Sequence, residues 1–115
     1  MSDHYFDSSA TGAVELLRSG RSLLSFFELT NPNTSDVYLQ LFDAAAVSSV
    51  TLGSTTPDLS FHCPAGTSTT VRAIRAESFD DPVEFLNGIC YAVTTTATNA
   101  TSPGTAATVN ILARP

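Results

Sequence analysis

An alternation of side-chain types with a period of two is strongest at positions 36–46, DVYLQLFDAAA. One parity of this run is aliphatic, and the other carries two aromatic residues around an amide: Tyr38, Gln40 and Phe42. Successive side chains of a strand point to opposite faces of its sheet, so both faces of this strand are too apolar for contact with water. We therefore expect a central strand, or one whose outer face meets a neighbouring subunit.

Other segments alternate in the same way and are separated by turn-forming proline, glycine and asparagine. We expect strands at 22–30 (SLLSFFELT), 59–63 (LSFHC), 69–76, 85–98 (FLNGICYAVTTTAT) and 106–113, and a short extended piece at 50–52. The weak alternation at 69–76 indicates an edge strand. Segment 13–18 (AVELLR) is interpreted as a short strand in a hairpin with 22–30, with one turn of helix as the alternative. Asn87-Gly88 is either a hairpin turn or a bulge at the start of its strand.

Seven or eight strands, no clear helix and regular turn signals predict an all-β protein. The architecture expected is a single antiparallel β-sandwich or jelly roll, spanning 13–115 and preceded by an extended N-terminal arm at 1–12. Tyr5 and Phe6 form an aromatic pair in this otherwise polar arm. They are the candidate partner-binding residues, docking on a neighbouring surface; the alternative is a frayed terminus with two incidental aromatics.

The most acidic stretch, 77–84 (ESFDDPVE), is expected to be a solvated loop. Adjacent Asp80 and Asp81 raise the possibility of a calcium site, but Ca²⁺ needs six to eight oxygens from a looped arrangement, and no such ligand spacing follows. We therefore predict no metal and no cofactor.

Composition narrows the classes of function. The chain has 115 residues, no lysine and a net charge of −6, from eleven acidic residues against five arginines. Without a basic run it has no electrostatic means of holding nucleic acid. No stretch has the roughly 20 apolar residues that span a bilayer, and the N-terminus lacks the features of a secretory signal. We expect folding in the cytoplasm, where Cys63 and Cys90 stay buried thiols unless their strands face each other.

Sequence motifs argue against an enzyme. There is no nucleophile elbow, phosphate loop or zinc-protease motif, and His4 and His62 are expected to be ordinary polar residues. Four carboxylates could pair for glycoside hydrolysis, as any acidic chain allows: Asp43, Asp58, Glu77 and Glu84.

Several short pieces between positions 23 and 111, taken together, resemble small structural proteins of tailed-bacteriophage virions. The pattern is an asparagine-rich turn, a YLQLFDA strand, a PAG turn, and an F-x-N-G-I step into a threonine-rich strand. Its matching residues are Asn31, Tyr38, Leu39, Gln40, Leu41, Phe42, Asp43, Pro57, Pro64, Ala65, Gly66, Phe85, Asn87, Gly88, Ile89, Thr94, Thr95 and Thr96. The resemblance implies a virion component without catalytic residues.

A small acidic β-sandwich with many surface hydroxyls suits repeated weak attachment to a symmetric shell. We expect a capsid decoration or cement protein on the capsid surface, a homotrimer that binds the major capsid protein and itself. The alternative is a tail or fibre module that recognises a host-surface glycan or another tail protein. A glycan site usually needs an exposed aromatic platform; the chain has no tryptophan, and Tyr38 and Tyr91 lie in strands expected to be buried.

Overall fold

A computed structural model describes residues 3–67 and 71–115, which form eight strands and one short 3-10 helix. The strands are β1 (Asp3–Ala10), β2 (Glu15–Ser19), β3 (Ser22–Asn31), β4 (Val37–Asp43), β5 (Leu59–Cys63), β6 (Ala73–Phe85), β7 (Gly88–Thr94) and β8 (Ala107–Arg114). The helix η1 (Val47–Ser49) lies in the connection from β4 to β5.

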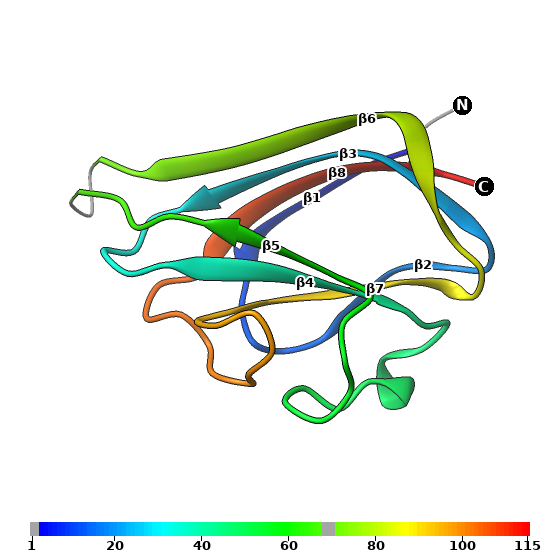
Figure 1. Ribbon diagram of the computed structural model, residues 1–115, viewed down its shortest axis with the longest axis horizontal. Coiled ribbons are helices and arrows are strands. Elements are labelled where there is room, and N and C mark those ends of the chain that lie inside the picture. The colour runs from blue at the N-terminus through cyan, green and yellow to red at the C-terminus, as the bar shows by residue number, and fades with distance from the viewer. Residues whose placement is uncertain (1–2, 68–70) are drawn as a thin grey trace.

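Two four-stranded antiparallel sheets pack face to face (Figure 1). Sheet A has the order β1-β8-β3-β6, and sheet B has the order β2-β7-β4-β5. The first strand therefore pairs with the last, the second with the seventh, the third with the sixth and the fourth with the fifth. This nested pairing is that of a jelly roll, so the expected fold class is confirmed.

The main core lies between the sheets and is built by the inward parity of each strand. In β4 it is the aliphatic parity, whereas β8 contributes Ala107, Val109, Ile111 and Ala113. On β3, Phe27 points inward and contacts Phe61 of β5, with ring centroids 4.5 Å apart. As expected, β4 is a central strand. The edge strand expected at 69–76 is in part the edge strand β6, which begins only at Ala73; positions 69–70 lie outside the described residues.

The expected arm is wrong for residues 3–10, which form edge strand β1 along β8. The prediction failed because two of the inward positions of β1 are acidic and hide the alternation. Asp7 accepts a hydrogen bond from the Tyr91 hydroxyl of sheet B at 2.7 Å, and Asp3 lies 3.6 Å from the Arg18 guanidinium. Polar contacts thus replace the apolar ones that mark a strand in sequence.

The expected solvated loop at 77–84 is also wrong, because all of it lies within β6. Its alternation places Phe79 and Val83 toward the core, whereas Asp80 and Asp81 are exposed on an edge strand. The register of β6 against β3 shifts between Ser78, which pairs with Phe26, and Val83, which pairs with Leu24. That irregularity carries the acidic residues and Pro82, which made the segment look like a loop.

Three local predictions are corrected by the topology. Segment 13–18 does become a strand, but β2 pairs with β7 in sheet B and not with β3. The extended piece at 50–52 is not a strand; it follows η1. Gly88 begins β7 with φ +151°, and because β6 and β7 lie in different sheets, Asn87-Gly88 is no hairpin turn.

Candidate functional site

The two residues predicted to bind a partner point to opposite sides of β1. Tyr5 packs against the main core, so its ring is used inside the domain. Phe6 points outward and leaves 63% of its surface exposed. Only Phe6 of the pair therefore stays a candidate for contact with another protein.

Phe6 belongs to the outer face of sheet A, defined here by the outward residues in register on its four strands. One row across the sheet runs from Phe6 through Asn110 and Glu28 to Ala76, and the next from His4 through Leu112 and Phe26 to Ser78. The remaining outward positions are Arg114, Leu23 and Glu84 at one end, and Thr108, Thr30 and Ile74 at the other.

This outer face combines apolar side chains with a short polar chain. Ile74 is 61% exposed, and neither Phe26 nor Leu112 packs against the core. A short polar chain crosses the same face. The His4 Nε2 atom lies 2.9 Å from the Asn110 Oδ1 atom, and the Asn110 Nδ2 atom donates to Glu28 at 3.4 Å. The surface is amphipathic and is held in place by the regular strands beneath it.

Charge is sparse on this face. Its registered positions carry one arginine (Arg114) and two glutamates (Glu28 and Glu84), a formal sum of −1, whereas the chain carries −6. The exposed Asp80 and Asp81 lie at the edge of the face, in the irregular part of β6. Glu84 is ion-paired with Arg21 at 2.6 Å. Depletion of charge is a property of the centres of protein interfaces.

The centre of the outer face of sheet B, in contrast, is covered by the chain itself, whereas Leu16 on edge strand β2 stays 43% exposed. The connection from β4 to β5 lays Ala44, Val50 and Leu52 against Phe42 and Cys90. In the connection from β7 to β8, the Asn99 carbonyl accepts a hydrogen bond from the Gln40 side-chain amide at 3.0 Å. In Figure 1 both connections lie below β4 and β7, whereas no described segment lies above sheet A.

The cover excludes water from the middle of β4, where the Gln40 side chain is fully buried. Its Nε2 atom donates to the Thr94 hydroxyl at 2.6 Å and to the Asn99 carbonyl, two acceptors that set the orientation of the amide. Its Oε1 atom has no hydrogen-bond partner among the described residues.

The sheet edges, unlike the bare face, carry features that oppose pairing with another strand. Edge strand β6 presents Asp80, Asp81 and Pro82 at its irregular register. Edge strand β1 has Asp3 and Asp7 pointing inward, and inward charges make an edge a poor template for another strand. Edge strand β2 is short and carries a register shift, and on edge strand β5 the Arg75 guanidinium binds the His62 carbonyl at 3.0 Å.

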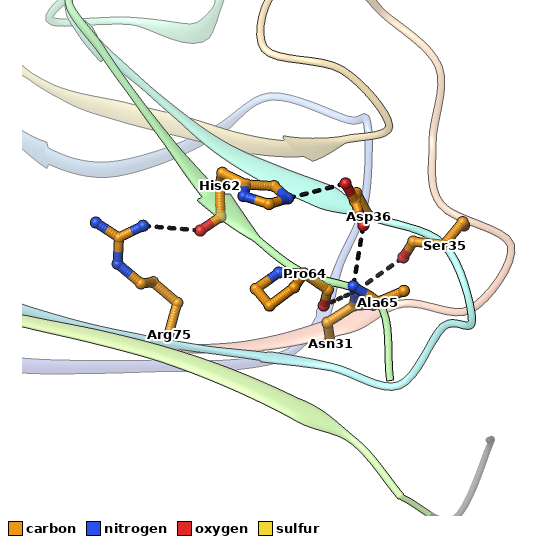
Figure 2. Close-up of polar contacts among 7 residues, drawn as sticks. All are labelled: Asn31, Ser35, Asp36, His62, Pro64, Ala65 and Arg75. Atoms are coloured by element: carbon orange, nitrogen blue, oxygen red, sulfur yellow. Dashed lines mark hydrogen bonds and ion pairs between the residues drawn. The ribbon is translucent and has the colours of Figure 1, made fainter. Parts of the chain in front are cut away.

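Figure 2 shows that the two turns at one end of the sandwich interlock. The buried Asn31 amide donates to the Ser35 carbonyl at 2.9 Å and to the Pro64 carbonyl at 3.0 Å. Asp36 accepts from the Ala65 amide at 3.0 Å, and its other oxygen lies 2.9 Å from the His62 Nε2 atom. The asparagine-rich turn and the PAG turn are therefore joined by side-chain bonds, and His62 belongs to this structural cluster.

A second interlock joins two other pieces of the sequence pattern. The Asp43 carboxylate accepts from the Leu86 amide at 3.1 Å and from the Asn87 amide at 2.7 Å. The Asp43 amide in turn donates to the Asp58 carboxylate at 2.7 Å. Both carboxylates line a cavity of about 340 Å³ with Phe42, Val50 and Asn87, and both are used to anchor backbone.

The other candidate carboxylates are separated from this cavity and are ion-paired. Glu77 lies 2.6 Å from Arg75, and Glu84 lies 2.6 Å from Arg21. The structure therefore brings together Asp43 and Asp58 alone from the four carboxylates considered for glycoside hydrolysis. Among the described residues, no group of three or more histidines, cysteines or carboxylates is placed to hold a metal ion.

The two thiols are free and buried, on opposite sides of sheet B. Cys63 points into the main core, whereas Cys90 points to the covered outer face, where its sulfur lies 3.6 Å from the Ala44 carbonyl. Burial raises the pKa of both thiols, so they stay protonated at neutral pH and pack as small apolar side chains.

Comparison with known proteins adds no family: no protein-family model matches the chain, and no curated protein matches it. In the part of the chain that the structure describes, no helix is long and apolar enough to cross a membrane.

Proposed function

We propose that this protein is a non-enzymatic structural component of a phage virion, a capsid decoration protein that binds the major capsid protein. The observation that carries the proposal is the difference between the two sheets: sheet A leaves a regular, charge-poor, amphipathic face bare, while sheet B is covered. A rigid sheet with one bare face and disfavoured edges is suited to association through that face.

Three further points support a structural function over a catalytic one. The resemblance to phage virion proteins spans most of the chain. The jelly roll is a fold of viral capsid and lectin domains, which raises the prior for a virion protein by analogy of fold alone. The carboxylates and imidazoles that sequence offered for catalysis bind backbone amides, arginines or a neighbouring amide or carboxylate.

Stoichiometry tests the proposal directly. Quantitative mass spectrometry of purified virions of the phage that encodes this chain should find it at a copy number comparable to that of the major capsid protein. Virions made without it should release their DNA at a lower temperature, because the shell loses contacts between neighbouring capsomers. A copy number far below that of the major capsid protein would contradict decoration and would favour the tail or fibre module.

A further inference from the structure

We propose that the outer face of sheet A is the interface between two copies of this chain. The copies are related by a twofold axis that runs parallel to the strands and between β3 and β8. This inference deepens the proposed function, on which its biological setting rests, because it names the partner that occupies the bare face while the chain is free of the capsid. One face holds one partner at a time, so a second copy and the major capsid protein would compete for it.

The register of sheet A makes its outer face complementary to itself about this axis. The rotation places β8 over β3 of the partner and β1 over β6 of the partner, while each cross-strand row stays in its row. Leu112 then lies over the partner subunit's Phe26, and Phe6 lies over the partner subunit's Ala76. Large side chains thus meet apolar or small ones in the rows that carry most of the apolar surface.

In the same arrangement, a hydrogen-bond donor of each copy faces an acceptor of the other. Asn110 lies over the partner subunit's Glu28, and its own bond to Glu28 is long, at 3.4 Å. The amide nitrogen of asparagine has two protons, so it can serve the carboxylates of both copies. Aligned sheets pack at about 30° to one another, which shifts the corners of the face but leaves pairs beside the axis in contact.

The charge distribution is compatible with a second copy at this face. Two chains of net charge −6 repel each other, but the registered positions of the face sum to −1, and Arg114 lies at the same end of the face as Glu84. The exposed Asp80 and Asp81 lie at the edge of the face on β6, away from the axis. Few like charges therefore meet beside the axis when the two sheets A face each other.

The area of the face sets the strength of the pair. Four strands about 4.8 Å apart, each at least eight residues long, give a footprint of roughly 500 Å² per copy, or about 1,000 Å² in total. That is the lower limit for a specific interface, so we expect a reversible dimer whose population depends on protein concentration. The sequence instead predicts a homotrimer, and the two expectations are separable by mass.

Sedimentation velocity of the purified full chain, over roughly a hundredfold range of concentration, should show a monomer–dimer equilibrium. Phe6→Ser should raise the dimer dissociation constant at least about tenfold, because it removes an apolar contact of the face. Asn110→Asp should also weaken the dimer, since it adds a carboxylate beside Glu28 of both copies. Leu86→Ser is the matched control: Leu86 is 66% exposed, close to the 63% of Phe6, but lies outside sheet A.

Circular dichroism should confirm that the three variants are folded. A monomer at every concentration, a trimer, or equal weakening by Leu86→Ser and Phe6→Ser would each overturn the inference. These outcomes are independent of the copy number on virions, so failure of the dimer and failure of the proposed function are distinguishable.

Discussion

The outer faces of the two sheets differ although both are built from alternating strands of the same domain. On sheet B, most outward residues of the central strands are buried by two connections of the chain itself: Phe42, Cys90, Ala92 and Thr94 are at most 1% exposed, whereas Tyr38 is partly exposed. On sheet A, the outward residues of the central strands keep part of their surface in water. The difference teaches that an apolar outward parity does not by itself indicate an intermolecular contact, because loops of the same chain can cover it.

The sharpest test makes the same substitution, phenylalanine to aspartate, on each of the two outer faces. Phe42→Asp should cost on the order of 4 kcal/mol of unfolding free energy or prevent folding, because it buries an unpaired carboxylate and removes a core ring. Phe26→Asp should cost only about 1–1.5 kcal/mol, since water can solvate the new charge on the bare face. Urea unfolding followed by circular dichroism measures both. Equal losses of stability would remove the distinction between the faces.

A glycine at the start of β7, packed against the covering connection, provides the next test. A Cβ atom on Gly88 would lie 2.6 Å from the Arg18 carbonyl and 2.7 Å from the Ala44 carbonyl, at φ +151°. Gly88→Ala should therefore cost about 3 kcal/mol or more, because backbone has to move as well as adopt a strained φ.

Gly20→Ala is the control for backbone strain alone. Gly20 has φ +89°, but nothing lies within 4 Å of the position that a Cβ atom would take there. We expect a loss of about 1 kcal/mol, from the positive φ only. If the two substitutions had the same effect on thermal stability, the close approach of β2, β7 and the covering connection at Gly88 would be disproved.

The smallest effect concerns the hydrogen bond between Tyr91 of sheet B and Asp7 of sheet A, which crosses the interior of the sandwich. Burial and the hydrogen bond to Asp7 raise the pKa of the Tyr91 phenol in the folded state. The unfolded phenol ionises near pH 10, so above that pH the unfolded state binds fewer protons and stability falls, by about 1.4 kcal/mol per pH unit.

Tyr91→Phe removes the contribution of this phenol to the pH dependence of stability but leaves the contributions of the Cys63 and Cys90 thiols unchanged. The variant should be about 1–2 kcal/mol less stable than the wild type below pH 10, because the half-buried Oδ2 atom of Asp7 loses the hydroxyl that donates to it. The gap in unfolding free energy should then narrow as pH rises above 10. A gap that stays constant in alkaline urea titrations would contradict a raised pKa of Tyr91.

Strongly periodic strands were predictable from sequence, whereas the two strands at the edges of sheet A were not predicted correctly. The alternation of β4, β7 and β8 reports burial on at least one face, so their positions and inward parities could be read directly. In β1 the inward acids find polar partners on the opposite sheet, and in β6 exposed acids and Pro82 interrupt the pattern. Half-exposed strands lack the repeated apolar signal on which such predictions depend.

The candidate interaction surface was predictable only in part. Phe6 was recognised as unusual in a polar segment, but its separation from Tyr5 depends on the pairing of β1 with β8. The other members of the face come from strands far apart in the chain, such as Phe26 and Leu112. Pieces of the sequence pattern are joined in space, Asn31 to Pro64 and Asp43 to Asn87, so their spacing reflects the needs of the fold.

By itself, the sequence determined an all-β sandwich and the two-sided burial of its central strand, because alternation and turn residues act locally. It left open whether the outer side of that strand meets a neighbouring subunit or the chain itself. Tertiary structure alone decided this, by placing the connections after β4 and β7 over sheet B and leaving sheet A bare. The physical reason is that coverage depends on where distant segments return, and no local pattern of side chains encodes that path.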